Sequence, residues 1–120
     1  MTQLVDVIES DQWDVYIGRA RRKALNPRLK VDHEFTAPYV PHRGRDDWRE
    51  HAQVEYRKHL VRMIQRPEVL KRFEDLRNRR LGVWGDFGLE MGQVVVNLLN
   101  ELQRWPASRL AEDIEGAGDE

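Results

Sequence analysis

At 120 residues, the chain has the length of one domain with a single core. Hydrophobic residues make up 40% and charged residues 34%, as in ordinary globular proteins, and no apolar run approaches the roughly 18 residues of a membrane span. The chain has no cysteine, which excludes disulfides, thiolate metal sites and a cysteine nucleophile. Because the first nine residues lack the basic and apolar regions of a signal peptide, we expect a cytoplasmic protein.

Charge is unevenly distributed, although the formal net charge is only −1. The segment from Arg19 to Lys30 contains no acid and six basic residues: Arg19, Arg21, Arg22, Lys23, Arg28 and Lys30. The last ten residues contain five acids and no base. This asymmetry is typical of a local anion-binding surface combined with an acidic tail. We therefore expect a single domain over residues 1–105 and a disordered tail over residues 106–120.

The first third of the chain predicts two short strands and a long loop. Residues 4–8 and 14–18 mix β-branched, aromatic and polar residues, and the turn between them would allow a hairpin. Residues 19–44 show no sustained period and contain three prolines, although a short strand over residues 31–36 is compatible with the pattern. A loop of this length in a small domain is usually functional or disordered.

The clearest helix signal follows this loop. Apolar residues recur every four positions from Trp48 to Ile64, which predicts a helix over about residues 47–65 with one face in the core. Asp47 and Glu50 form a variant of the capping box at its beginning. Pro67 ends it, because proline cannot continue the hydrogen-bond ladder.

The rest of the chain predicts a helix from Pro67 to about Asn78, a buried strand over residues 81–84 and a final helix over residues 89–103. The expected fold class is therefore α/β, a small single domain in which an approximately three-stranded sheet packs with three helices. The side chains expected to be mostly buried are Trp48, Leu60, Ile64, Val95 and Leu98.

Four segments carry a resemblance to a known family. They are the run from Asp14 to Arg19, the element Leu25-Asn26-Pro27-Arg28, the pair Tyr56-Arg57 and the run from Leu76 to Gly82. In their order and residue types, these segments resemble the domain of unknown function 4326 family of bacteriophages and bacteria, over roughly residues 4–103. The resemblance implies an α/β domain and an accessory protein of phage or mobile-element origin, which would act in the cytoplasm of the host cell.

The chain departs from that family at the family's cysteines and histidine. Val83, Gly85 and Glu90 stand where the family has cysteines, Met91 replaces its histidine and Gln93 its aspartate. The family residues resemble a cluster of soft-metal ligands, which the side chains present here cannot form. We therefore expect no metal and no other cofactor.

The most prominent candidate site follows the second strand. Arg19 comes directly after a strand and a glycine, and Asn26 opens a turn before Pro27, so the two side chains could hold a phosphate or a carboxylate. The structural alternative is that Gly18 allows a tight turn and Asn26 caps it, and the sequence leaves both interpretations open.

A second candidate lies in the segment Gly85-Asp86-Phe87-Gly88, between a strand and a helix. Free N–H groups and the helix dipole at such a position favour anions, but Asp86 and Glu90 would repel one. Together the two candidates predict no catalytic or metal-binding residue and the following ligand-binding residues: Tyr16, Gly18, Arg19, Asn26, Arg28, Trp84 and Asp86. The four histidines lack the i, i+4 spacing of a helical metal site.

Two classes of function follow. The first is a non-enzymatic binding or accessory protein that recognises a nucleotide or other phosphate-bearing ligand, a nucleic acid or an acidic host protein through the arginine-rich loop. Trp13, Tyr16 and Tyr39 would then suit base stacking, although a net charge near zero argues against strong non-specific duplex binding. The second is a small nucleotide-directed enzyme with its site at the strand ends, formed by Arg19, Asn26, Arg28 and Asp86. Neither class involves a membrane.

Overall fold

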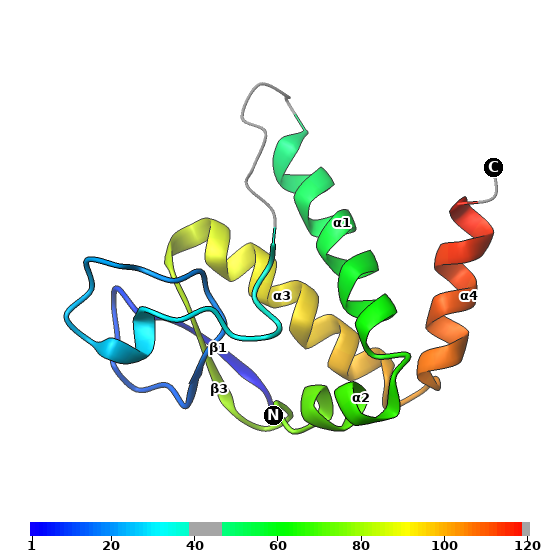
Figure 1. The fold of residues 1–120 in the computed structure, drawn as a ribbon, viewed down its shortest axis with the longest axis horizontal. Helices are drawn as coiled ribbons and strands as arrows, with labels where there is room; N and C mark the ends of the chain where they lie inside the picture. Colours follow the sequence, from blue (N-terminus) through cyan, green and yellow to red (C-terminus); the bar gives the residue numbers. More distant parts are fainter. Residues whose placement is uncertain (39–46, 119–120) are drawn as a thin grey trace.

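The computed structural model describes residues 1–38 and 47–118 and forms a single α/β domain (Figure 1). Its elements in chain order are β1 (Gln3–Asp6), β2 (Val15–Tyr16), the 3-10 helix η1 (Pro27–Leu29), α1 (Trp48–Met63), α2 (Pro67–Glu74), β3 (Arg80–Val83), α3 (Gly85–Glu101) and α4 (Ala107–Gly118). The three strands and the three main helices confirm the predicted fold class.

The sheet is parallel, with strand order β1-β3-β2. The central strand β3 pairs with both neighbours, so that Leu81 lies opposite Leu4 on one side and Val15 on the other. The first two strands therefore do not form the hairpin that the sequence allowed. The reason is that Leu81, Gly82 and Val83 are all buried, and a strand buried on both faces takes the centre of a parallel sheet.

Successive side chains of the strands face opposite sides of the sheet, and each side is covered differently. The side chains that join the main core with the helices are Leu4, Val15, Leu81 and Val83. Those that join a second cluster with Trp13 and Leu29 are Val5, Tyr16 and Trp84. Residues 19–30, hereafter the basic loop, thus cover the sheet on the side away from the helices.

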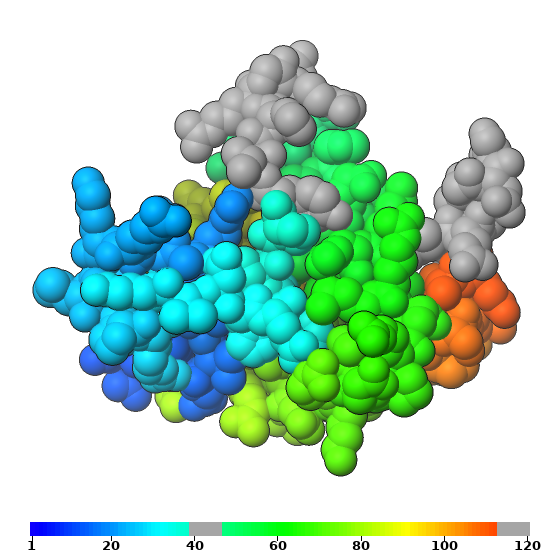
Figure 2. All heavy atoms as spheres, in the orientation of Figure 1, coloured from blue at the N-terminus to red at the C-terminus, as the bar shows by residue number. Residues whose placement is uncertain are grey.

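Helix α3 packs directly against the sheet, α1 packs against α3, and α4 packs against α1. The close approach of α3 depends on Gly92, because a Cβ atom there would lie 2.7 Å from Leu4 Cδ2 and 3.1 Å from Val83 Cγ1. Figure 2 shows residues 31–38, in cyan, filling the space between the N-terminal segment and α1. This segment contains no strand, contrary to the prediction for residues 31–36, but Phe35 is fully buried.

Four of the five side chains expected in the core are fully buried: Leu60, Ile64, Val95 and Leu98. Trp48 is only partly buried, because it lies in the first turn of α1, beyond the core, where it packs on Phe87 with a ring-centroid distance of 5.1 Å. The predicted capping box does not form, since the Asp47 side chain makes no capping hydrogen bond.

Three boundaries differ from the predictions. Helix α2 ends at Glu74, and Asn78 then adopts φ 66°, a left-handed conformation that asparagine tolerates. Helix α3 begins at Gly85 rather than residue 89. The region predicted as a disordered tail contains α4. Ala107 and Leu110 are buried in the main core, and these apolar side chains hold the helix on the domain, whereas the prediction of disorder considered only the acidic residues.

Candidate functional site

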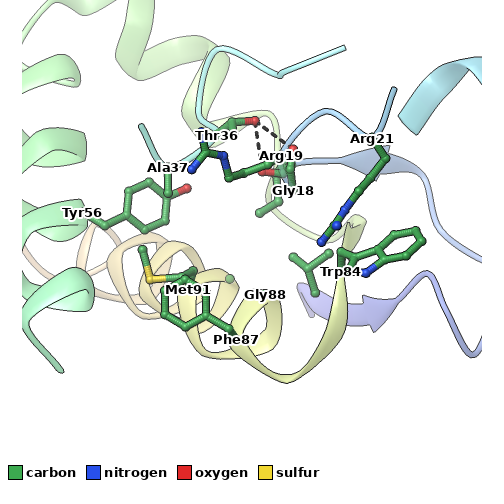
Figure 3. Close-up of a pocket in the computed structure, with 13 residues that line it drawn as sticks. Gly18, Arg19, Arg21, Thr36, Ala37, Tyr56, Trp84, Phe87, Gly88 and Met91 are labelled. Carbon is green, nitrogen blue, oxygen red and sulfur yellow. Dashed lines mark hydrogen bonds between the residues drawn. The ribbon is translucent and has the colours of Figure 1, made fainter. Parts of the chain in front are cut away.

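A pocket opens at the carboxyl ends of β2 and β3, where small α/β domains usually bind their ligands. Its volume is about 100 Å³. Its walls come from the end of β2, the end of β3, the first half of α3, α1 and the segment before residue 38 (Figure 3). The lining residues are Ile17, Gly18, Arg19, Arg21, Thr36, Ala37, Tyr56, Val83, Trp84, Phe87, Gly88, Met91 and Gly92.

Glycines shape this strand-end pocket. A Cβ atom at Gly18 would lie 2.6 Å from the Tyr16 hydroxyl oxygen, and one at Gly88 would lie 3.2 Å from Val83 Cβ. The strand end therefore folds back over the Tyr16 ring, and α3 presents a small residue to the pocket. Phe87 and Met91, on the same part of α3, supply the apolar floor.

Two hydroxyl groups hold the wall that precedes α1. Thr36 Oγ1 lies 3.1 Å from the Ile17 carbonyl oxygen and 3.2 Å from that of Gly18, to which it donates its proton, and it accepts a hydrogen bond from His33 N at 2.9 Å. The Tyr56 hydroxyl donates to the Phe35 carbonyl, and burial raises the pKa of Tyr56 far above its usual range. Both hydroxyls are thus structural, and the phenol stays protonated at physiological pH.

Two arginines stand at the mouth of the pocket. Both are exposed, and Figure 3 shows the Arg19 side chain extending past Thr36 while Arg21 lies beside Trp84. The Arg21 guanidinium carbon is 4.3 Å from the centroid of the Trp84 ring, a cation–π contact that orients the guanidinium.

Tyr16 interacts with both arginines. Its hydroxyl donates to the Arg19 carbonyl oxygen at 2.6 Å. Burial raises the pKa of Tyr16, and the neighbouring Arg21 guanidinium lowers it in part. The mouth is therefore cationic and held in place, while the floor is apolar.

Of the residues predicted to bind a ligand, Gly18, Arg19 and Trp84 line the pocket. Tyr16 does not line the pocket and is buried with Trp13 in the second cluster, so neither ring is available on the surface for base stacking. Arg21 was not among the predicted site residues. Its role depends on contact with Trp84, at the junction of β3 and α3, which no local sequence signal reveals.

Asn26 and Arg28 lie outside the pocket and have structural contacts. The Asn26 side chain accepts from Arg28 N at 2.9 Å and caps η1, as the structural alternative expected of this residue. The Arg28 guanidinium donates to the Asp14 carbonyl and lies 4.0 Å from the centroid of the Trp13 ring. Asp86, also predicted to bind a ligand, is exposed in the first turn of α3 and does not line the pocket.

The N-terminus of α3 already has a carboxylate of the chain beside it. Asp6 Oδ1 accepts hydrogen bonds from Gly85 N at 3.1 Å and from Ile8 N at 3.0 Å. Together with the nearby Asp86, this carboxylate disfavours a bound phosphate at the helix end. The position of Asp6 at the end of a strand was a signal for such a role, but only the parallel sheet brings it beside Gly85.

Within residues 1–38 and 47–118, no three histidine, aspartate or glutamate side chains are grouped so that they could hold a metal ion. His33 Nδ1 accepts a hydrogen bond from Phe35 N at 3.2 Å, and burial lowers the pKa of this imidazole. Tyr39 and His42 lie outside the described residues. None of the described helices has the length and apolar character needed to cross a membrane.

Comparison with family models, with curated proteins and with solved structures finds no match to this chain. The resemblance to the domain of unknown function 4326 family therefore stays a prediction from the sequence, and the geometry of the strand-end pocket is the basis for any functional proposal.

Proposed function

We propose that this protein is a non-enzymatic binding protein whose ligand is a nucleotide, held in the strand-end pocket. The observation that carries this proposal is the combination of an apolar floor with two arginines at the mouth. Ligand pockets generally pair apolar walls with a few placed polar groups that set orientation.

The two parts of a nucleotide match the two parts of the pocket. Phe87, which is only partly buried, offers apolar surface to a flat base, while Tyr56 and Met91 line the same pocket but are almost fully buried. The guanidinium groups of Arg19 and Arg21 present forked N–H donors, which suit phosphate oxygens. Because Asp6 already accepts from the first N–H of α3, the phosphate belongs at the arginines rather than at the helix end.

Binding is favoured over catalysis by the chemistry of the lining. The residues around the pocket include no carboxylate, imidazole or thiol, the groups that most often act as general acids, bases or nucleophiles. The hydroxyls of Thr36 and Tyr56 are engaged with backbone carbonyls. Asp86, the acid on which a nucleotide-directed enzyme would depend, lies outside. The resemblance to the domain of unknown function 4326 family supports the further proposal of an accessory role in a phage or mobile element.

Calorimetric titration tests the proposed function with three ligands: a nucleoside 5′-monophosphate, the matching nucleoside and inorganic phosphate. We expect the nucleotide to bind more tightly than either part, because it uses the apolar floor and the arginines together. The absence of binding for all four common nucleotides would overturn the proposal. Equal affinity for phosphate and nucleotide would show that the pocket floor takes no base.

A further inference from the structure

The basic loop is held in a defined conformation by hydrogen bonds, and its residues Arg19 and Arg21 line the pocket. Arg21 N donates to the Leu29 carbonyl oxygen at 2.6 Å, and Ala20 N donates to Asp32 Oδ1 at 2.6 Å, so the two ends of the loop are tied together. Leu29 is buried against the cluster that contains Trp13 and Tyr16. The loop is therefore anchored on the sheet, and Figure 1 shows it projecting on the side away from α1 and α4.

Three cationic side chains of this loop make no interaction that stabilises the fold in the described part of the chain. Arg22, Lys23 and Lys30 are exposed, and in the described part of the chain none of them has an ion pair or a side-chain hydrogen bond. Arg28, by contrast, donates a hydrogen bond to the Asp14 carbonyl and lies over the Trp13 ring.

In the sequence, these cations directly follow Arg21 or its backbone partner Leu29. Arg22 and Lys23 directly follow Arg21, which lines the pocket. Lys30 follows Leu29, whose carbonyl accepts from Arg21 N. The loop hydrogen bond thus places Arg22 and Lys30 on the two chain segments that are joined at Arg21 and Leu29.

We propose that Arg22, Lys23 and Lys30 hold consecutive phosphates of a single-stranded nucleic acid, one nucleotide of which occupies the strand-end pocket. The proposal rests on the proposed function and extends it from a free nucleotide to a strand. Cationic surface beside a site for an individual base is the usual arrangement in proteins that bind single strands.

The pocket favours a single strand over a duplex as the ligand. A base can enter it only when it is unpaired and unstacked, and opening a duplex costs a few kcal/mol per extruded base. The overall formal charge of −1 also offers little attraction to the dense charge of a duplex away from this loop. An acidic protein surface would use the cations but leave the pocket empty.

The test compares three proteins: wild type, the loop variant Arg22→Ala/Lys23→Ala/Lys30→Ala, and the control variant Arg62→Ala/Lys71→Ala/Arg104→Ala. The control removes the same charge from exposed side chains on α1, α2 and the turn after α3. Each protein is titrated with four probes: a nucleoside monophosphate, a single strand of nucleic acid, the matching duplex and a polyglutamate peptide. The single strand is about 12 nucleotides long, which is within the site size of a small binding domain. Thermal melts check that all three proteins are folded.

For wild type we expect the single strand to bind at least roughly tenfold more tightly than the mononucleotide, the duplex or polyglutamate, since only the strand uses both surfaces. The loop variant should lose that advantage yet bind the mononucleotide like wild type, and the control variant should behave like wild type with every probe. The slope of log affinity against log salt for the single strand should fall by about 2 in the loop variant, at about 0.7 per neutralised phosphate.

The contrary outcomes separate the two proposals. If the loop variant keeps wild-type affinity for the strand while the mononucleotide still binds, the strand proposal fails and the nucleotide pocket stands. If the mononucleotide does not bind to wild type, the proposed function itself fails. Equal affinity of wild type for the strand and the duplex, or for the strand and polyglutamate, would also overturn the strand proposal, because a binding mode that ignores unpaired bases does not use the pocket.

Discussion

The guanidinium of Arg21 lies over the indole of Trp84, with its central carbon 4.3 Å from the ring centroid. Arg21 lies in the loop after β2 and Trp84 directly follows β3, so the contact joins the chain just beyond the carboxyl ends of two neighbouring parallel strands. It also orients a cation at the mouth of an otherwise apolar pocket. The contact therefore links the topology of the sheet to the proposed recognition of a nucleotide.

The first prediction concerns the core face of α1. Leu60→Ala should lower the free energy of unfolding by about 2–5 kcal/mol, because the side chain is fully buried and its loss leaves a cavity. Val54→Ala on the same helix is the control, since Val54 is 51% exposed, and it should cost less than about 0.5 kcal/mol. Urea denaturation measures both, and equal effects would show that this face of α1 is not core.

The second prediction concerns Asp6, which joins the end of β1 to the start of α3. Asp6→Ala should destabilise the domain by roughly 1–2 kcal/mol, because the N–H groups of Ile8 and Gly85 lose their acceptor. Asp6→Asn retains an acceptor oxygen and should recover most of that loss. If alanine and asparagine are equally destabilising in chemical denaturation, these two hydrogen bonds do not hold α3 in place.

The third prediction tests the strand end at Gly18. Gly18→Ala places a Cβ atom 2.6–2.7 Å from atoms of the buried Tyr16 ring, so the ring or the strand end must move. We expect a loss of about 1–3 kcal/mol, as for overpacked sites, and weaker nucleotide binding, because Tyr16 also supports the Arg19 backbone. Calorimetry and thermal melting would measure the two effects, and wild-type values in both would contradict the described packing.

The fourth prediction concerns pH. Burial lowers the pKa of His33 and His59 below their ordinary value of 6.5, and for His33 the neighbouring Glu34 opposes this shift. The folded state therefore takes up these protons less readily than the unfolded state. The free energy of unfolding should be highest above pH 6.5 and should decrease as the pH falls from there toward the folded-state pKa values.

His33→Asn offers a direct check on the pH prediction. Asparagine can still accept the hydrogen bond from Phe35 N that His33 Nδ1 accepts, but it does not titrate. Its free energy of unfolding should therefore vary less with pH over that range than that of wild type. An unchanged slope would mean that His33 contributes nothing to the pH dependence.

Local patterns predicted the α/β class and most of the core, because the apolar period of α1 extends over four turns and ends in the fully buried Leu60 and Ile64. The pairing of the strands was not predictable in the same way. The choice of β3 as the centre depends on contacts between residues far apart in the chain, such as Val15 with Leu81 and Leu4 with Leu81.

The site shows the same division. Gly18, Arg19 and Trp84 were predictable because each follows or ends a strand, and parallel strands meet at their carboxyl ends. Arg21 and Asp6 owe their roles to partners at the junction between β3 and α3, far away in the sequence. The capping role of Asn26 was one of the two interpretations that the sequence left open, whereas the contact of Arg28 with Trp13 is seen only in the folded structure.

The central claim is that a nucleotide binds in the strand-end pocket. The most direct test compares the affinities of two variants, Arg21→Ala and Arg22→Ala, for a nucleoside 5′-monophosphate. The two residues are adjacent, exposed and equally charged, but only Arg21 lines the pocket and stacks on Trp84. We predict that Arg21→Ala weakens binding roughly tenfold or more, as expected for the loss of a hydrogen bond to a charged group, while Arg22→Ala binds like wild type. Equal affinities of the two variants would contradict a nucleotide site at the ends of β2 and β3.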